Sequence, residues 1–320
     1  MKAIIVKEFG APEVLKPEET ADLEPDENQI LVRVKASGVN PVDTYIRAGL
    51  YAQKPNLPFT PGKDAAGIIE KIGANIKKFE VGERVLTAGS LTGTYAEFCL
   101  CEEKYLIKLP ENISFEQGAG VFVPYATSYR ALFQKARAQK HETVLIHGAS
   151  GGVGIAAVQW AKHAGLKIIG TASSDEGKKL VKEQGADFVF DHSKENYLSE
   201  IKEATNGRGV DVILEMLANV NLVKGFGVLA MFGRITIIGN RGSLDFNPRL
   251  AMGKDASIFG MSLFNAPENE MNEIYQAIFD GLSKGFLNPI VGKTFPLAKA
   301  AAAHHAVLEE KAFGKIILIS

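Results

Sequence analysis

The sequence predicts an α/β protein with two domains, a β-rich barrel-like domain and a domain built on a doubly wound parallel sheet. The chain has 320 residues, which corresponds to about two domains at roughly 150 residues each. Short strands separated by turn residues dominate up to about residue 123, and apolar strands alternate with helical stretches after it. Near residue 148, a strand runs directly into a glycine-rich turn and a helix.

The first domain is predicted over residues 1–123 from its strand pattern. Short apolar runs recur with turn residues between them, at Ala3–Val6, Ile30–Ala36, Ala65–Ile72, Glu83–Thr87 and Tyr95–Cys101. This close spacing of short strands is typical of a barrel-like β domain.

The second domain is predicted over residues 124–264. Apolar strands are expected at Val144–His147, Lys167–Gly170, Phe188–Phe190, Val210–Leu214 and Ile235–Ile238, with helical stretches between them. Such alternation indicates a parallel sheet covered by helices. Residues 265–320 carry two helical stretches, Glu268–Lys284 and Leu297–Glu309, and a last strand, Lys315–Ile319. We expect this segment to complete the first domain.

The composition excludes several classes of protein. With 36 basic and 37 acidic residues, the net charge is −1, which offers no electrostatic footprint for nucleic acid. We find no targeting segment and no apolar run near the ~20 residues that span a membrane, so a cytoplasmic protein without membrane contact is predicted. The two cysteines, Cys99 and Cys101, exclude a disulfide framework and a four-cysteine zinc lobe.

The glycine-rich loop predicts a dinucleotide site. Thr143–His147 reads as a buried strand, and Gly148-Ala-Ser-Gly-Gly-Val-Gly154 leads from it into the apolar-periodic helix Ile155–His163. In this alanine variant of the fingerprint, Gly151 lets backbone N–H groups approach a pyrophosphate and Gly154 lets the helix pack on the strand. S-adenosylmethionine and flavin sites use similar loops, and glycines also serve tight turns. The strand-turn-helix context favours a nicotinamide dinucleotide.

The end of the next strand favours NADPH over NADH. An NAD site needs an acidic residue there for the ribose 2′-OH, whereas this chain has Thr171-Ala-Ser-Ser174. Small hydroxyl residues leave room for a 2′-phosphate, and Lys178 and Lys179 can add positive charge. In the other interpretation, Ser173 and Ser174 cap the following helix, and the two interpretations are compatible.

Five long motifs carry a resemblance that covers essentially the whole chain. They are Gly38-Val-Asn-Pro-Val-Asp-Thr-Tyr-Ile-Arg47, Pro58-Phe-Thr-Pro-Gly62, His147–Gly154, Glu215-Met-Leu-Ala-Asn-Val-Asn-Leu222 and Asn247-Pro-Arg249. The chain resembles the medium-chain dehydrogenase/reductase family, in its quinone oxidoreductase branch, which includes the zeta-crystallins. The resemblance implies a GroES-like catalytic domain, a Rossmann domain inserted before the C-terminal segment, and transfer of reducing equivalents from NADPH to a quinone.

The resemblance also implies that the enzyme is zinc-independent. Zinc-dependent members have a cysteine where this chain has Asn40, and Gly-His-Glu where it has Gly62-Lys63-Asp64. Without thiolate and imidazole ligands, no Lewis acid is expected. The histidines lack paired ligand spacing, so we interpret all six as non-metal residues: His141, His147, His163, His192, His304 and His305.

Carried over residue by residue, the resemblance implies a set of cofactor-binding positions. They are Tyr45, Thr127, Ser150, Gly151, Gly152, Val153, Ser173, His192, Asn221, Ile238, Gly239, Asn240 and Arg241. Many relatives also aim a lysine at the 2′-phosphate, but its usual place here holds Gly177, and Lys178 follows one residue later. Neighbouring residues of a helix point about 100° apart, so the sequence leaves open whether Lys178 contacts the 2′-phosphate.

The candidate catalytic residues lie on the segment that lines the cleft in this family. Hydride transfer needs a dry stacking slot over the nicotinamide more than a protein acid. Asn40, Asp43, Tyr45 and Tyr51 cluster on this segment, and Tyr45 could donate to a developing oxyanion or stack on an aromatic acceptor. In the alternative interpretation, Tyr45 and Ile46 belong to the core and Asp43 caps the short helix.

Three other functions remain open from the sequence. They are reduction of an enone or enoyl thioester, a zeta-crystallin-like RNA-binding role, and a structural lens-type role. No basic and aromatic stretch supports RNA binding.

The sequence also predicts a homodimer or homotetramer. The sixth strand of the doubly wound sheet, Ala256–Leu263, lies at a sheet edge and carries no charge. An apolar edge favours pairing with another chain, unless the C-terminal helices cover it.

Overall fold

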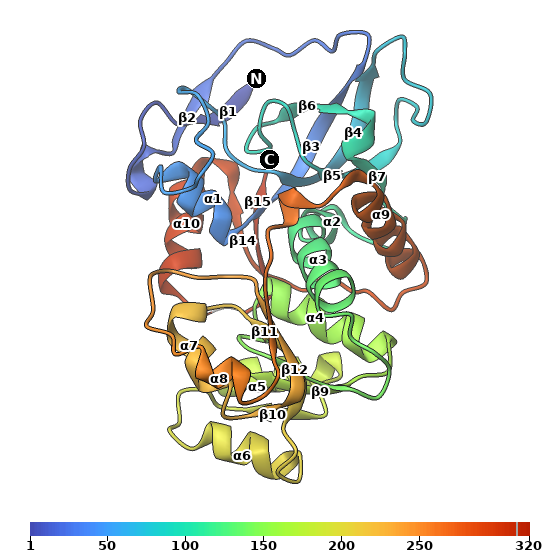
Figure 1. Cartoon of the computed structure of the whole chain (residues 1–320). Coiled ribbons are helices and arrows are strands. Elements are labelled where there is room, and N and C mark those ends of the chain that lie inside the picture. The colour runs from blue at the N-terminus through green and yellow to red at the C-terminus, as the bar shows by residue number, and fades with distance from the viewer. Residues whose placement is uncertain (312) are drawn as a thin grey trace. The chain divides into compact units, whose positions relative to one another are not determined.

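The computed structural model describes residues 1–311 and 313–320 and has the predicted α/β architecture (Figure 1). It divides into two compact units, unit 1 with Met1–Val123 and Phe279–Ser320 and unit 2 with Pro124–Ile278. The first division falls where the sequence pattern changes, after residue 123.

The second division falls after Ile278, whereas the sequence pattern predicts it after residue 264. The reason is the helix α9 (Glu268–Ser283), which begins in unit 2 and ends in unit 1. Its first turns bind unit 2, because Glu270 pairs with Arg130 and Glu273 accepts a hydrogen bond of 2.7 Å from the hydroxyl of Tyr129. The pattern of strands and helices in the sequence does not show these contacts, so it does not show where the boundary between the units falls.

Unit 1 is built from β strands. They are β1 (Lys2–Ile5), β2 (Lys16–Glu19), β3 (Gln29–Val39), β4 (Asp64–Ile72), β5 (Arg84–Ala88), β6 (Phe98–Glu102), β7 (Leu106–Lys108), β14 (Val291–Pro296) and β15 (Lys315–Ile319). Seven of them form one sheet in the order β14-β15-β3-β4-β5-β7, with β6 also paired to β3, and β1 and β2 form a separate pair. β15 is antiparallel to β3, so the C-terminal segment belongs to this sheet.

Short helices and turns connect the strands of unit 1. They are α1 (Pro41–Arg47), α2 (Phe115–Ala119), α10 (Ala300–Glu309) and the 3-10 turns η1 (Pro12–Val14), η2 (Glu103–Tyr105) and η5 (Leu297–Lys299). Strands β2, β7 and β14 are not in the sequence prediction. The sequence of β2, Lys-Pro-Glu-Glu, has no apolar alternation, and it is a strand only because it pairs with β1.

The core of unit 1 includes two apolar clusters. One contains Ile30, Val32, Ile69 and Val85 of the sheet, and the other contains Ile4, Val6, Tyr95 and Leu318 together with Ala303 of α10. Cys99 and Cys101 belong to the first cluster as free, buried thiols with their Sγ atoms 3.9 Å apart.

Unit 2 contains the predicted parallel sheet. Its strands are β8 (Thr143–Ile146), β9 (Lys167–Thr171), β10 (Phe188–Phe190), β11 (Val210–Glu215), β12 (Leu229–Ile237) and β13 (Ser257–Gly260). All neighbours are parallel, in the order β10-β9-β8-β11-β12-β13. This is the doubly wound order, so the predicted fold class is confirmed.

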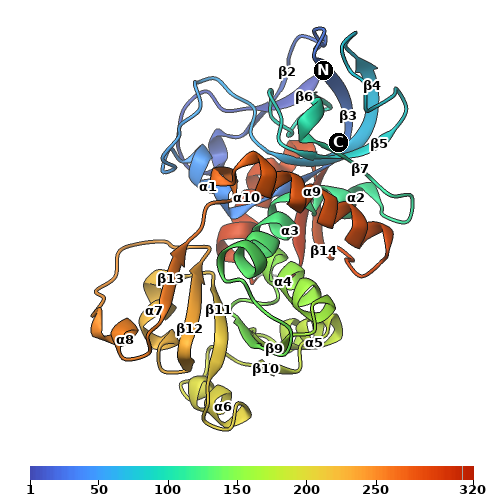
Figure 2. The same cartoon turned by 45° about the vertical axis from the view of Figure 1, so that its right-hand side comes forward.

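Helices cover both sides of this sheet, with α4 and α5 on one side and α7 and α8 on the other (Figure 2). The helices and turns of this part of the chain are α3 (Phe122–Tyr129), which begins in unit 1, the π-helical turn η3 (Arg130–Lys135), α4 (Gly152–His163), α5 (Asp175–Gln184), α6 (Tyr197–Ala204), α7 (Ala218–Gly225), α8 (Arg249–Met252) and the 3-10 turn η4 (Leu263–Asn265). In the described residues, no helix is long and apolar enough to cross a membrane.

Strand β12 begins six residues earlier than the sequence predicts, at Leu229 instead of Ile235. Its register to β11 shifts between the pairs Val210–Leu229 and Val212–Arg234. Met231 and Phe232 in this irregular part are exposed, and Phe232 has a φ of +61°. Because these apolar side chains are exposed, the apolar pattern of the sequence does not show where the strand begins.

Candidate functional site

The glycine-rich loop follows β8 and packs tightly against β9. Ala149 N–H donates to Thr171 O at 2.8 Å, and Gly148 has a φ of +59°, a conformation that glycine adopts without strain. A Cβ on Gly154 would lie 2.5 Å from Ala149 Cα. The first turn of α4 therefore packs closely on the glycine-rich loop at Gly154.

The first turn of α4 has the features of an anion site. Gly151 is the N-cap residue, and no side chain caps the helix there. Gly151, Gly152 and Val153 are partly exposed, and Ser150 before them is buried. The N–H groups of a first helical turn lack partners within the helix, so they can bind a phosphate at the positive end of the helix dipole. These residues fit the pyrophosphate of a dinucleotide.

The ends of β9 and β10 hold Ser173 and His192. Ser174 Oγ accepts a hydrogen bond of 3.1 Å from Gly177 N–H, which confirms Ser174 as the cap of α5. Ser173 is not this cap, so its predicted contact with a 2′-phosphate remains a separate prediction. His192 Nδ1 lies 3.2 Å from Thr171 Oγ1, and burial lowers the pKa of His192.

Lys178 points to the end of β10. Its ammonium lies 2.8 Å from Asp175 and 3.8 Å from Asp191, and the hydrogen bond to Asp175 raises the pKa of Lys178. A Cβ on Gly177 would instead lie 3.3 Å from Ser150 Cβ. Position 177 thus faces the glycine-rich loop, and Lys178 faces the acidic residues beside His192.

A buried hydrogen bond between His147 and Glu215 joins the ends of β8 and β11 at the carboxyl edge of the sheet. Nδ1 of His147 lies 2.5 Å from the carboxylate of Glu215, and both side chains are buried. Glu215 also accepts from Leu217 N–H at 2.7 Å and from Asn221 Nδ2 at 3.3 Å. Burial is the largest influence and raises the pKa of Glu215, but the hydrogen bonds from His147, Leu217 and Asn221 and the electrostatic effect of His147 together outweigh it, so the pKa is lowered. Nε2 of His147 is buried without a partner among the described residues.

Backbone and side-chain hydrogen bonds join the loops after β11 and β12. Ile238 N–H donates to Glu215 O at 2.9 Å, and Ala218 N–H donates to Gly239 O at 3.0 Å. Asn219 links the loops twice, because its N–H donates to Asn240 Oδ1 at 2.9 Å and its Oδ1 accepts from Arg241 N–H at 3.0 Å. The structure thus brings together five predicted cofactor residues: Asn221, Ile238, Gly239, Asn240 and Arg241.

Thr127 lies apart from these loops in the sequence, on α3, and is buried. Glu215 and His147 were missed as site residues by sequence reasoning. The signal for Glu215 is an acidic residue at the end of the apolar strand Val210–Leu214, which is costly unless the carboxylate is paired.

The four candidate catalytic residues of unit 1 divide into two pairs. Asn40 and Asp43 are buried, whereas Tyr45 on α1 and Tyr51 after it are half-buried. Asn40 N–H donates to Asp43 Oδ2 at 2.8 Å at the start of α1. Asn40 is the N-cap residue of α1, and Asp43, the third residue of the helix, completes the capping box, so Asp43 contributes to the cap from within α1 rather than from before it.

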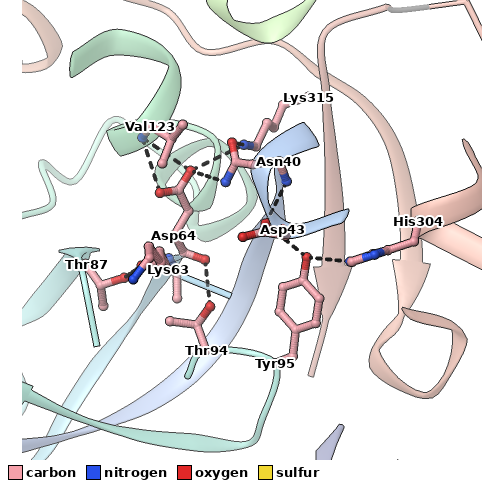
Figure 3. A network of polar contacts seen from close by, with 11 residues as sticks. Asn40, Asp43, Lys63, Asp64, Thr87, Thr94, Tyr95, Val123, His304 and Lys315 are labelled. Carbon is pink, nitrogen blue, oxygen red and sulfur yellow. Dashed lines mark hydrogen bonds and ion pairs between the residues drawn. The ribbon is translucent and has the colours of Figure 1, made fainter. Parts of the chain in front are cut away.

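A buried polar network surrounds Asn40 (Figure 3). Asn40 Nδ2 donates to Asp64 at 3.0 Å, and Asn40 Oδ1 accepts from the ammonium of Lys315. Lys315 also lies 3.3 Å from Asp64. Burial raises the pKa of Asp64 against the effect of Lys315, and it lowers the pKa of Lys315 against the effect of Asp64.

The network continues from Asp43 to α10 (Figure 3). The hydroxyl of Tyr95 lies 3.3 Å from Asp43 Oδ2 and 3.2 Å from His304 Nε2. Burial lowers the pKa of His304 to about 3 and raises that of Asp43 to about 6, with Asp64 contributing to the latter. Asn40 and Asp43 therefore bind protein groups, and Tyr45 and Tyr51 are the candidates with exposed surface.

Zinc-dependent relatives have metal ligands at the positions of Asn40, Lys63 and Asp64, and these positions form a different arrangement in this chain. Among the described residues, no three His, Cys, Asp or Glu side chains form a group that could hold a metal ion. Asn40 and Asp64 bind Lys315, which already carries a positive charge.

The comparisons with known proteins cover both units. A family model described as "Alcohol dehydrogenase GroES-like domain" matches residues 26–111, and one described as "Zinc-binding dehydrogenase" matches residues 152–280. The chain is 46% identical to the quinone oxidoreductase of Homo sapiens over 100% of this chain and 98% of that protein. It is 47% identical to the quinone oxidoreductase of Rattus norvegicus, with the same coverage.

A solved structure supports the same relationship. The Escherichia coli quinone oxidoreductase complexed with NADPH matches with a TM-score of 0.91 and 32% identity, over 100% of both chains. The whole-length identity, the two family models and the doubly wound sheet agree with the resemblance in the motifs. The chain belongs to the quinone oxidoreductase branch of the medium-chain dehydrogenase/reductase family.

Proposed function

We propose that the chain is an NADPH-dependent quinone oxidoreductase that works without zinc. The observation that carries this proposal is the identity of 46% to a quinone oxidoreductase over the whole chain. The match to a relative that was solved with NADPH supports the choice of cofactor.

The residues at the carboxyl edge of unit 2 fit NADPH. The uncapped first turn of α4 would hold the pyrophosphate. Ser173 would bind the 2′-phosphate, for which no acidic residue competes in Thr171-Ala-Ser-Ser174. The joined loops with Asn221, Asn240 and Arg241 would bind the nicotinamide half.

When bound, NADPH supplies a hydride to the quinone, which takes one further proton to give the hydroquinone. We assign Tyr45 to the acceptor, since its phenol can donate to the quinone oxygen as negative charge develops there. Tyr51 offers a second aromatic surface. Asn40 and Asp43 hold α1 in place, because their polar atoms bind Asp64, Lys315 and Tyr95.

We further propose a homodimer or homotetramer in the cytoplasm. The support for an oligomer is β13, which pairs only with β12 among the described strands and has Ile258 and Phe259 in its centre.

The test is a panel of 1,4-quinones and enones, each with NADPH and with NADH, before and after chelation with EDTA. We expect NADPH oxidation with quinones as the best acceptors and full activity after chelation. Faster reduction of enones or enoyl thioesters would replace this proposal by the related reductase activity. Loss of activity on chelation, with stoichiometric zinc in the untagged protein, would contradict the zinc-independent mechanism. A salt-sensitive mobility shift with RNA would establish the RNA-binding role.

A further inference from the structure

The ammonium of Lys315 is buried at the first residue of β15, where its side chain is 6% exposed. It donates to Asn40 Oδ1 and lies 3.3 Å from Asp64 Oδ2. Two glycines leave room for the stem of this side chain. A Cβ on Gly38 would lie 2.9 Å from Lys315 Cε, and one on Gly120 would lie 3.3 Å from Lys315 Cγ. The surroundings therefore accept a long unbranched side chain at position 315.

The contacts of Lys315 and Asp64 determine the orientation of the Asn40 carboxamide (Figure 3). Its oxygen accepts from Lys315, and its nitrogen donates to Asp64 at 3.0 Å. A carboxamide held at both ends cannot flip without losing both bonds. Asn40 is also the residue before α1, and its N–H donates to Asp43.

Helix α1 depends on this attachment at its N-terminus. It has only seven residues and begins with Pro41, and isolated helices of this length are unstable in water. Its place in unit 1 is therefore set by tertiary contacts, namely those of Asn40 and Asp43 at its start and of Arg47 at its end. Tyr45 lies between these two ends.

We propose that Lys315 is a positioning residue for Tyr45, acting through Asn40 and the N-terminus of α1. This inference rests on the proposed function, in which Tyr45 contacts the quinone. The ammonium matters because the carboxyl group of Asp64 is buried and Lys315, at 3.3 Å, is the cation beside it. Without the ammonium, Asp64 loses its charge partner and Asn40 loses the donor that orients its oxygen.

The same carboxylate also binds the start of α3. Val123 N–H lies 3.2 and 3.3 Å from the two oxygens of Asp64, in the first turn of that helix. Lys315 is thus the charge partner of Asp64, and Asp64 also binds the N-termini of two helices, α1 through Asn40 and α3 through Val123. A buried ion pair adds little net stability compared with an apolar replacement, so a role in positioning accounts for the pair better than a role in stability.

The test begins with Lys315→Met, which keeps an unbranched stem and removes the charge. Lys71→Met is the matched control, because Lys71 forms an exposed pair with Glu24 at 2.7 Å in the same unit. We expect Lys315→Met to lower kcat/KM for the quinone by about tenfold or more, which corresponds to ~1.4 kcal/mol. The Kd for NADPH should change by less than about threefold. Lys71→Met should change neither quantity.

A double-mutant cycle with Tyr45→Ala separates positioning from general damage. If Lys315 acts through Tyr45, the loss caused by Lys315→Met should fall to about twofold or less in the Tyr45→Ala background. Equal losses in both backgrounds would overturn the proposal. Unchanged quinone kinetics in folded Lys315→Met would overturn it as well. If Lys315→Met does not fold, Asn40→Ser replaces it in the cycle with the same expected outcomes, because serine still caps a helix.

A readout without catalysis distinguishes this proposal from the proposed function. We would place 3-fluorotyrosine at position 45 and record its ¹⁹F resonance. Lys315→Met should shift or broaden this resonance, and Lys71→Met should leave it unchanged. An unchanged resonance in Lys315→Met would overturn the positioning role. Absence of quinone reduction in the unaltered protein would overturn the proposed function, while the ¹⁹F comparison would still decide whether Lys315 positions Tyr45.

Discussion

His147 and Glu215 follow paired positions on the neighbouring strands β8 and β11, and their side chains meet at 2.5 Å in the interior of unit 2. The carboxylate of Glu215 connects β8 to the loop after β11, because it also accepts from Leu217 N–H and Asn221 Nδ2. This loop is joined to Gly239, Asn240 and Arg241 by further hydrogen bonds. One buried acid thus supports the part of the edge that we assign to the nicotinamide.

Glu215→Gln should destabilise unit 2. A buried carboxylate with three hydrogen-bond partners becomes a neutral amide, and an NH₂ group replaces one of the two oxygens that these partners contact. We expect the free energy of unfolding to fall by about 1–3 kcal/mol, measured by urea titration. Glu183→Gln, at an exposed position of α5, is the control and should change stability by less than about 0.5 kcal/mol. An equally small change for Glu215→Gln would contradict a structural role of the pair.

Gly151→Val should abolish NADPH binding and leave the fold intact. Gly151 is the partly exposed N-cap of α4, and a branched side chain there would occupy the space of the pyrophosphate. Fluorescence titration measures the Kd, and circular dichroism checks the fold. Gly151→Ala should give a smaller loss because its side chain is smaller. If the valine variant still binds NADPH normally, the loop has been misassigned.

The unaltered protein should prefer NADPH to NADH, and Ser173→Asp should reduce this preference. A carboxylate at this position would repel the 2′-phosphate and accept from a free 2′-OH. We expect kcat/KM for NADPH to fall at least about tenfold, or ~1.4 kcal/mol, with a smaller change for NADH. Ser173→Asn is the uncharged control of similar size. Comparable kcat/KM values with NADH and NADPH in the unaltered protein would refute the assignment.

Asp43 should make stability decrease as pH rises from about 4 to about 6. Burial raises the pKa of Asp43 from 3.8 to about 6, and the charge of Asp64 adds to this. In this window the folded protein keeps a proton that the unfolded chain has lost, so the contribution of Asp43 is full below the window and lost above it. Asp43→Asn removes this titration.

The measurement compares the free energies of unfolding of Asp43→Asn and the unaltered protein at pH 4.5 and pH 7. Acids that do not interact with Asp43 titrate in both proteins and cancel in the difference. Between these two pH values the variant should gain about 2 kcal/mol relative to the unaltered protein, at ~1.4 kcal/mol for each pKa unit. A difference that is independent of pH would show that Asp43 titrates normally.

The protein should form at least a dimer through β13. This strand lies at the edge of the sheet, and no Lys, Arg, Asp or Glu occurs in residues 256–267. An apolar edge without a charged residue favours antiparallel pairing with a second copy. Light scattering after size exclusion should give at least twice the 34.5 kDa of one chain, and Ile258→Lys should lower that mass. A single species of one-chain mass at micromolar concentration would exclude the dimer.

The sequence alone determined the fold class, the approximate positions of the parallel strands and the glycine-rich loop, because each of these depends on local patterns. The strand, the turn and the helix of this loop lie within one continuous segment, Thr143–His163. Apolar periodicity identified the strands that are buried on both faces. It missed β2 and the start of β12, where pairing with a neighbour rather than the local sequence forms the strand.

Only the tertiary structure decided which polar residues meet. Lys315 and Asn40 are 275 residues apart, and His147 and Glu215 are 68 apart. Lys315 begins an apolar strand, and its sequence neighbours contain no sign of a carboxamide or a carboxylate partner. A charged side chain becomes a buried ion-pair partner when folding removes its water and brings a distant acid to it. For that reason the motif identified Asn40 and Asp43 as candidates, and the fold assigned them to holding α1.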